Sequence, residues 1–164
     1  IAYANASGSD YVIPEGIVKL EVEAFAKAVS LVSVSLPSSL TTIEINAFAH
    51  CSALKSLVIP SMVSTVGSGA CLACDSLESV VLSSKMTKIC AACFANCSKL
   101  NNVILPASIT EIEQNGFNSC QDLTNLSFAG TMSAWGQVKK GSYWREGSPF
   151  TSVTCSDGSS TVLD

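Results

Sequence analysis

Apolar residues recur along the chain at one constant spacing. Pro14, Pro37 and Pro60 set this spacing, because the interval between the first two equals the interval between the last two. Two further steps of the same length lead through Ser83 to Pro106. Units that begin one residue before each of these positions share seven apolar columns. The column at the thirteenth position of the five units contains Phe25, Phe48, Cys71, Phe94 and Phe117. Equal spacing predicts a solenoid, because a unit this short cannot bury its own apolar face and must stack on its neighbours.

Within each unit, the pattern predicts a strand followed by a compact segment. The segment Leu54-x-x-Leu57-x-Ile59-Pro60 ends in the every-second-residue spacing of a strand. The proline ends this strand because it has no N–H to give to the ladder. Residues 45–51 are rich in Ala, Phe and Cys, and we expect a short helical or 3-10 segment that turns Phe48 inward. The fold class predicted is a right-handed α/β solenoid with parallel strands stacked one per repeat.

The spacing divides the chain into three parts. Residues 13–127 form the five repeats, and residues 1–12 are interpreted as the remnant of a preceding repeat in a truncated array. Residues 128–164 do not follow the repeat, and we predict that they form a C-terminal cap. A cap is required because the last unit would otherwise expose an apolar edge and an unpaired strand. The large apolar residues available for it are Trp135, Trp144 and Phe150.

One complete unit carries a resemblance to a known family. It reads Leu36-Pro37-x-x-Leu40-x-x-Ile43-x-x-x-Ala47-Phe48-x-x-Cys51-x-x-Leu54-x-x-Leu57. This unit resembles the BspA-like leucine-rich repeats of bacterial surface proteins, and the resemblance covers residues 13–127. It implies a leucine-rich-repeat solenoid in a secreted or cell-surface protein that binds protein or glycan, as in adhesion, without catalysis. The departures from the pattern, which bear on local packing, are Ala28 for Cys, Cys71 for Phe, Ser83 for Pro, Cys93 for Ala and Gly116 for Ala.

Composition and charge narrow the classes of partner. Charged residues make up 13% of the chain, about half the usual share, so Ser, Thr and Asn must cover much of the surface. The net charge of −4 and the absence of a Lys/Arg cluster argue against a nucleic-acid partner. The sequence has no uninterrupted apolar run of about 18 residues, so we predict no membrane span. Residues 1–10 lack the basic start and apolar stretch of a signal peptide.

The eight cysteines are the main candidates for chemistry. Cys71-x-x-Cys74 and Cys90-x-x-Cys93 resemble zinc or redox spacings. The repeat favours buried structural thiols instead, because Cys71 replaces a core Phe and Cys93 replaces a core Ala. Disulfides remain an alternative, since neighbouring units lie about 5 Å apart, and a metal or redox protein is the third hypothesis of function. One column of the repeat contains Cys51, Cys74, Cys97 and Cys120.

The sequence offers no catalytic, cofactor or metal-binding set. His50 is the single histidine, so neither a Ser–His–Asp nor a Cys–His arrangement can be assembled, and we expect a surface position for it. Glu111 and Glu113 flank the core residue Ile112 at solvated positions, which do not provide the pocket that acid–base catalysis by a carboxylate pair needs. We therefore predict that the protein is not an enzyme.

The exposed strand positions are the best candidates for binding. They alternate with core positions and would lie together on the outward face of the sheet, which is the usual contact surface of a solenoid. We call this outward face the sheet face. The residues predicted to form the partner-contact surface are Ser56, Val58, Ser79, Val81, Asn102, Ile104 and Asn125. The leading hypothesis is a binding module that uses this face, and the alternative is a structural spacer or display stalk without a ligand.

Overall fold

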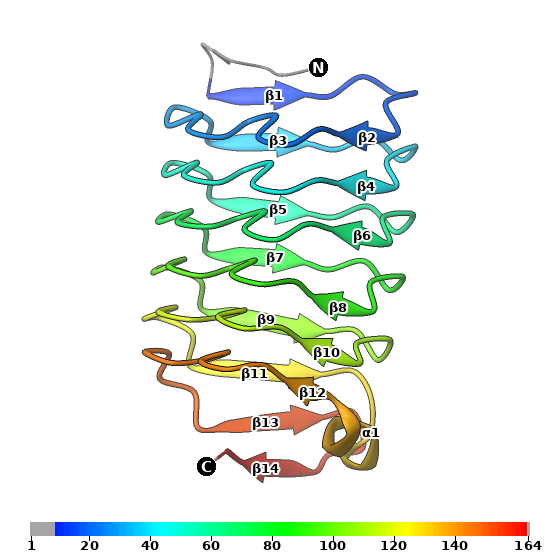
Figure 1. The fold of residues 1–164 in the computed structure, drawn as a ribbon, viewed down its shortest axis with the longest axis vertical. Helices are drawn as coiled ribbons and strands as arrows, with labels where there is room; N and C mark the ends of the chain where they lie inside the picture. The colour runs from blue at the N-terminus through cyan, green and yellow to red at the C-terminus, as the bar shows by residue number, and fades with distance from the viewer. Residues whose placement is uncertain (1–8, 164) are drawn as a thin grey trace.

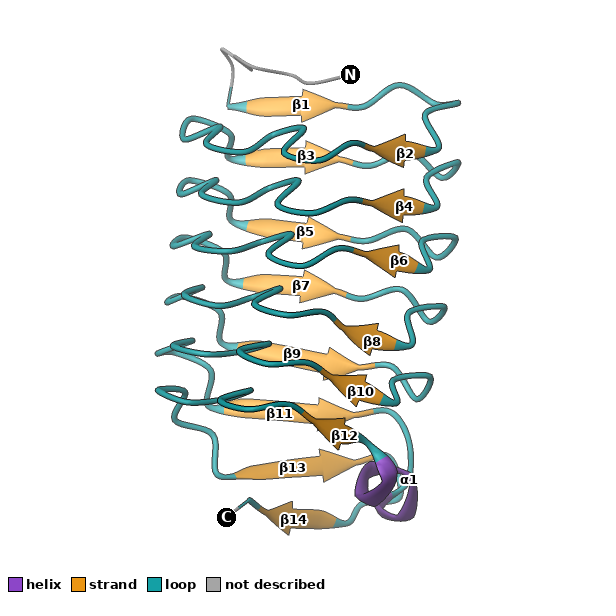
Figure 2. Cartoon of the chain, in the orientation of Figure 1, coloured by secondary structure: helices purple, strands orange, loops and turns teal. Residues whose placement is uncertain are grey.

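The computed structural model describes residues 9–163, which wind into a solenoid of about six turns (Figure 1). Each turn places a strand on one side of the coil and a shorter strand on the other, with little helix (Figure 2). The first side contains β1 (Asp10–Val12), β3 (Ser33–Ser35), β5 (Ser56–Val58), β7 (Ser79–Val81), β9 (Asn102–Leu105), β11 (Asn125–Phe128), β13 (Ser152–Cys155) and β14 (Ser160–Val162). The second side contains β2 (Lys19–Leu20), β4 (Thr42–Ile43), β6 (Thr65–Val66), β8 (Lys88–Ile89), β10 (Glu111–Ile112) and β12 (Lys139–Lys140).

The register of the strands confirms the spacing read from the sequence. Leu57 of β5 lies opposite Val80 of β7, and Val103 of β9 lies opposite Leu126 of β11, so both pairs are separated by the interval that separates the prolines. All of the pairs between turns are parallel, and β14 alone among the described strands runs antiparallel, on β13. The predicted stack of parallel strands, one per repeat, is therefore confirmed.

The repeated apolar columns form one continuous core between the two sides. Phe25 and Phe48 stack with ring centroids 5.3 Å apart and planes 12° from parallel. Phe94 and Phe117 stack in the same way at 5.5 Å and 9°. Cys71 occupies the position between the two pairs and is buried. The phenylalanines thus lie in one file, as the spacing predicts, with a single interruption at the cysteine.

The segment opposite the strands differs from the predicted helical one. It is a compact arc in which two residues four positions apart adopt left-handed backbone angles, for example Asn46 with φ 56° and His50 with φ 61°. Between them, Phe48 donates its N–H to the carbonyl of Ala70 in the next turn at 2.8 Å. An α-helix needs these N–H groups for its own carbonyls and excludes left-handed residues. In every repeat, main-chain hydrogen bonds to the next turn therefore take the place of the hydrogen bonds within a helix.

The C-terminal region closes the stack with an insertion. Ile112 pairs with Ile89 of the preceding turn and with Lys140 of the last turn. More residues separate Ile112 from Lys140 than separate Ile89 from Ile112, so the last turn is longer than a regular one. Its extra length accommodates helix α1 (Met132–Gln137). Trp135 of this helix is buried, 5.5 Å from the ring of Phe128 and 6.2 Å from that of Trp144. Thr131 Oγ1 accepts the N–H of Ala134 at 3.3 Å and begins the helix. The exact division into 1–12, 13–127 and 128–164 stays a prediction, and residues 1–8 lie outside the described part.

Candidate functional site

The structure gathers the predicted contact residues on one face. They are the outward positions of β5, β7, β9 and β11, while the alternate positions of these strands point into the core. Val58, Val81 and Ile104 are 59%, 56% and 57% exposed. Single exposed aliphatic residues are ordinary on a surface, whereas an aligned row on successive strands marks a candidate interface. Whether the row binds a partner stays a prediction.

Polar residues without charge form a second row beside the aliphatic one. Ser79 lies opposite Ser56 on one side and Asn102 on the other, and Asn102 lies opposite Asn125. Hydroxyl and amide groups both donate and accept hydrogen bonds, so the row can pair with neutral groups of a partner. The sheet face therefore presents one apolar and one polar stripe and no charged side chain among the predicted contact residues.

The sheet face contains a hollow that the repeat pattern does not predict. It has a volume of about 530 Å³ and lies over β7 and β9. Val81 and Ile104, both predicted contact residues, form part of its wall. The other lining residues are Ser79, Val80, Leu82, Asn101, Asn102, Pro106 and Ala129. Five of the lining residues are not among the predicted contact residues: Val80, Leu82, Asn101, Pro106 and Ala129. The nearest signal in the sequence is Ser83, which breaks the proline column beside Leu82.

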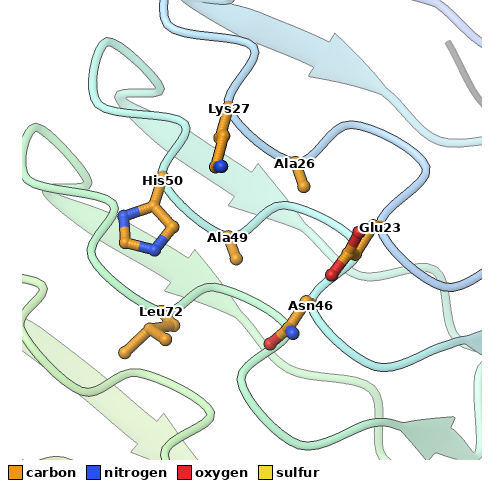
Figure 3. A pocket seen from close by; sticks show the side chains of 7 residues that line it. All are labelled: Glu23, Ala26, Lys27, Asn46, Ala49, His50 and Leu72. Carbon is orange, nitrogen blue, oxygen red and sulfur yellow. The ribbon is translucent and has the colours of Figure 1, made fainter. Parts of the chain in front are cut away.

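A second hollow of about 260 Å³ lies on the arcs, away from the sheet face. Figure 3 shows Lys27 and His50 extending from successive arcs at one end and Glu23 with Asn46 at the other. His50 is exposed, as predicted, and no hydrogen bond joins it to a carboxylate in the described structure. A general base needs a positioned partner within hydrogen-bond reach. The hollow therefore offers separate polar groups to solvent rather than a catalytic pair.

The cysteine column has a hydrogen-bonding role in the core. Sγ of Cys51, Cys74, Cys97 and Cys120 each donates at 3.1 Å to a carbonyl of the preceding turn. In the last turn, Oγ of Ser148 takes the same place and donates to the carbonyl of Phe117 at 2.5 Å. All eight cysteines are free thiols, and all but Cys90 are buried. The predicted inward orientation of the column agrees with the structure.

Burial leaves most of these thiols poorly suited to chemistry. It raises the pKa of Cys51 and of Cys120 to about 12. Burial also raises the pKa of Cys93 far above its ordinary value, and that of the half-buried Cys90, where nearby Glu113 adds to the effect. Only thiolates act as nucleophiles or metal ligands. Hydrogen bonds with Cys71 and Cys97 lower the pKa of Cys74, but its sulfur is enclosed in the core and out of reach of a substrate. Across residues 9–163, no three His, Cys, Asp or Glu side chains are placed to hold a metal ion.

The second side of the coil carries two of the ion pairs that link turns. Lys19 lies 3.0 Å from Glu44, and Lys88 lies 2.7 Å from Glu113, so each pair links two turns. The hydrogen bond from Lys88, with that from the Ala91 N–H at 2.9 Å, lowers the pKa of Glu113. A carboxyl with a lowered pKa cannot serve as a general acid near neutrality. This side of the coil is charged and internally paired, in contrast to the sheet face.

Comparisons with known proteins identify the repeat. The family model described as "BspA type Leucine rich repeat region (6 copies)" matches residues 1–137. Among curated proteins, none matches the chain in sequence. Within the described part, no helix has the length and apolar character needed to cross a membrane.

Solved structures of bacterial proteins share the fold. A leucine-rich repeat protein from Eubacterium ventriosum superposes with a TM-score of 0.71 and 21% identity, over 88% of this chain and 44% of that one. The leucine-rich repeat protein of T. pallidum gives a TM-score of 0.66 and 24% identity, over 82% and 73% of the two chains. The chain thus spans less than half the length of the first of these proteins.

Proposed function

Because the chain belongs to the BspA-type leucine-rich-repeat family, we propose that it is a non-enzymatic binding module of a secreted or cell-surface protein. In this proposal, the sheet face binds a partner protein or glycan. The contact residues are those predicted from the sequence: Ser56, Val58, Ser79, Val81, Asn102, Ile104 and Asn125.

The observation that carries the proposal is the aligned row of Val58, Val81 and Ile104. Each of these side chains is more than half exposed, although the sheet could carry polar residues there at no cost to the core. Interfaces of soluble proteins place apolar area at the centre of a polar rim. The flanking Ser and Asn row supplies such a rim on one side.

The test compares two triple substitutions with the same chemistry. Val58, Val81 and Ile104 are replaced by Lys in one variant, and the equally exposed Val18, Val22 and Val29 of the first turn in the other. The immobilised proteins are incubated with extracellular-matrix proteins and with an array of glycans. The proposal expects a ligand that the wild type and the first-turn variant retain and the sheet-face variant loses. Equal retention by both variants would contradict the choice of face.

The alternative function is a spacer that holds another domain away from the cell. It is favoured by the main-chain hydrogen bonds that join the arcs of successive turns and make the coil a rod. A spacer predicts that wild type and both variants retain no ligand above the level of an unrelated protein, so the same experiment separates the two functions.

A further inference from the structure

The ladder of the first side is interrupted at the hollow. Where two neighbouring strands are fully paired, the residue after the first strand donates its N–H to a carbonyl of the next turn. Ile59 donates in this way to the carbonyl of Val81 at 2.9 Å, and Ile13 to that of Ser35 at 3.0 Å. The equivalent bond from Leu82 to Ile104 is not formed, and only two pairs join β7 to β9, against four between β9 and β11.

The interruption coincides with the departure at Ser83. Its Oγ is buried and donates to the carbonyl of Ser61 at 3.1 Å, which ties this corner to the preceding turn. On the other side of the corner, Leu82 is half-buried, whereas Ile59 and Leu105 at the same position of the adjacent turns are buried. The gap between β7 and β9 thus opens on the side away from Ser61. A similar gap separates β3 from β5, where Leu36 forms no bond to Val58.

The chemistry of the hollow restricts its occupant. Its apolar wall is formed by Val81, Leu82, Ile104, Pro106 and Ala129, and its polar lining by serine and asparagine. A charged group would lose hydration there without gaining a counter-charge. A sugar would place its hydroxyl groups against aliphatic carbon and would find no aromatic ring among the lining residues on which to stack. An aliphatic or aromatic side chain gains free energy from the same wall.

The open ladder supplies the matching polar groups. The N–H of Leu82 and the carbonyl of Ile104 are not bonded to each other, because the pairing of β7 with β9 ends one residue earlier, and both residues line the hollow. A peptide main chain offers one donor and one acceptor per residue, which is the complement of this pair. An apolar side chain in a peptide therefore contacts the apolar wall of the hollow, while the peptide groups beside it bond to the N–H of Leu82 and the carbonyl of Ile104.

We propose that the hollow between β7 and β9 is an anchor pocket for an apolar side chain of a protein partner, whose main chain hydrogen-bonds to Leu82 and Ile104. This inference rests on the proposed function of the sheet face, and it selects protein over glycan as the partner.

The experiment uses small probes and NMR spectra of the ¹⁵N-labelled chain. The probes are N-acetyl-leucinamide, N-acetyl-aspartate amide and glucose. We expect the leucine probe to shift the amide signals of Leu82, Ile104 and Ala129 in a saturable manner. The aspartate and glucose probes should leave these signals unchanged at equal concentration. No saturable shift with the leucine probe, or equal shifts with glucose, would overturn the inference.

A matched pair of variants locates the pocket. Ala129→Tyr fills the hollow from its exposed rim, and Ala107→Tyr adds the same ring at an exposed position outside it. Loss of the apolar contacts should weaken the leucine probe about tenfold or more in A129Y, while A107Y should bind it as the wild type does. Unchanged binding in A129Y would refute the pocket.

The same pair of variants separates this inference from the function of the face. If a ligand from the retention experiment is lost by the sheet-face lysine variant and kept by A129Y, the face binds but the anchor pocket is wrong. If the leucine probe binds and no ligand depends on the face, the pocket stands and the proposed function fails. Loss of a protein ligand in A129Y and not in A107Y supports both.

Discussion

Replacing Cys97 with alanine tests whether the cysteine column stabilises the coil through hydrogen bonds between turns. Sγ of Cys97 donates to the carbonyl of Cys71 at 3.1 Å, and this carbonyl has no other donor among the described residues. Cys120 provides the comparison. Its Sγ donates at 3.1 Å to the carbonyl of Phe94, which also accepts the N–H of Cys97 at 3.3 Å.

The expected difference follows from what each substitution leaves behind. Both remove one fully buried sulfur, so both lose its apolar contacts and one hydrogen bond, about 1–2 kcal/mol in the free energy of unfolding. Cys97→Ala also leaves the Cys71 carbonyl buried without a partner, which costs a further ~1–3 kcal/mol. Cys120→Ala leaves the Phe94 carbonyl with its main-chain donor. We therefore expect Cys97→Ala to be the more destabilising by at least about 1 kcal/mol.

Urea unfolding followed by far-UV circular dichroism measures this difference. Equal slopes of the transitions are required, because a changed slope indicates a changed unfolded state or partial unfolding of the stack. Cys97→Ser should recover part of the loss, since Ser148 already forms the equivalent bond to Phe117 at 2.5 Å. If Cys120→Ala destabilises the protein as much as Cys97→Ala does, the sulfur contributes by packing alone and the reasoning is refuted.

Three further predictions concern other parts of the coil. Glu113 has a lowered pKa in the folded state, so its contribution to stability is present above its ordinary value of 4.5 and is lost as the pH falls through the lowered pKa. Glu113→Gln should therefore reduce the free energy of unfolding at neutral pH and make it depend less on pH under acid conditions, as measured by urea unfolding. An unchanged pH dependence in the variant would contradict this. Of the eight thiols, only half-buried Cys90 should react with Ellman's reagent before unfolding; rapid reaction of more than one would show that the core opens. A Cβ at Gly67 would lie 2.5 Å from the Ile45 nitrogen, so Gly67→Ala should lower the free energy of unfolding by about 1–3 kcal/mol, and a neutral effect in the same urea assay would disprove the close approach.

The apolar spacing was sufficient to predict the stack, because the contacts of a solenoid run between equivalent positions of neighbouring units. The file of Phe25, Phe48, Phe94 and Phe117 follows directly from it. The arcs were predicted less well, since a run of Ala, Phe and Cys is compatible with helix. The residue types at the left-handed positions do indicate the arc. Asn46, Gly69, Asn96 and Asn115 occupy them, and Asn and Gly are the residues that tolerate this conformation best.

The candidate site was predictable in its position but not in its shape. Alternation along β5, β7 and β9 identifies which side chains face solvent. Whether two neighbouring strands keep their ladder depends on how the corner after each strand packs. Ser83 reaches Ser61 by a hydrogen bond that a repeat consensus does not contain. The hollow beside Leu82 therefore required coordinates.

Some residues depart from the repeat pattern and give the coil features that the stacking of identical turns does not require. Cys71 removes one ring from the phenylalanine file, and Cys93 in the next turn replaces the smaller Ala of its column, so part of the lost volume is restored. In the longer last turn, Arg145 takes the position that Phe117 has in the turn before, so the row of stacked rings ends there. Its guanidinium donates to the carbonyls of Phe150 and Leu163. These three departures serve the core and the end of the stack. Ser83 lies instead at the corner where the ladder between β7 and β9 ends and a hollow opens on the exposed sheet, and this hollow is the physical reason to look for the ligand there.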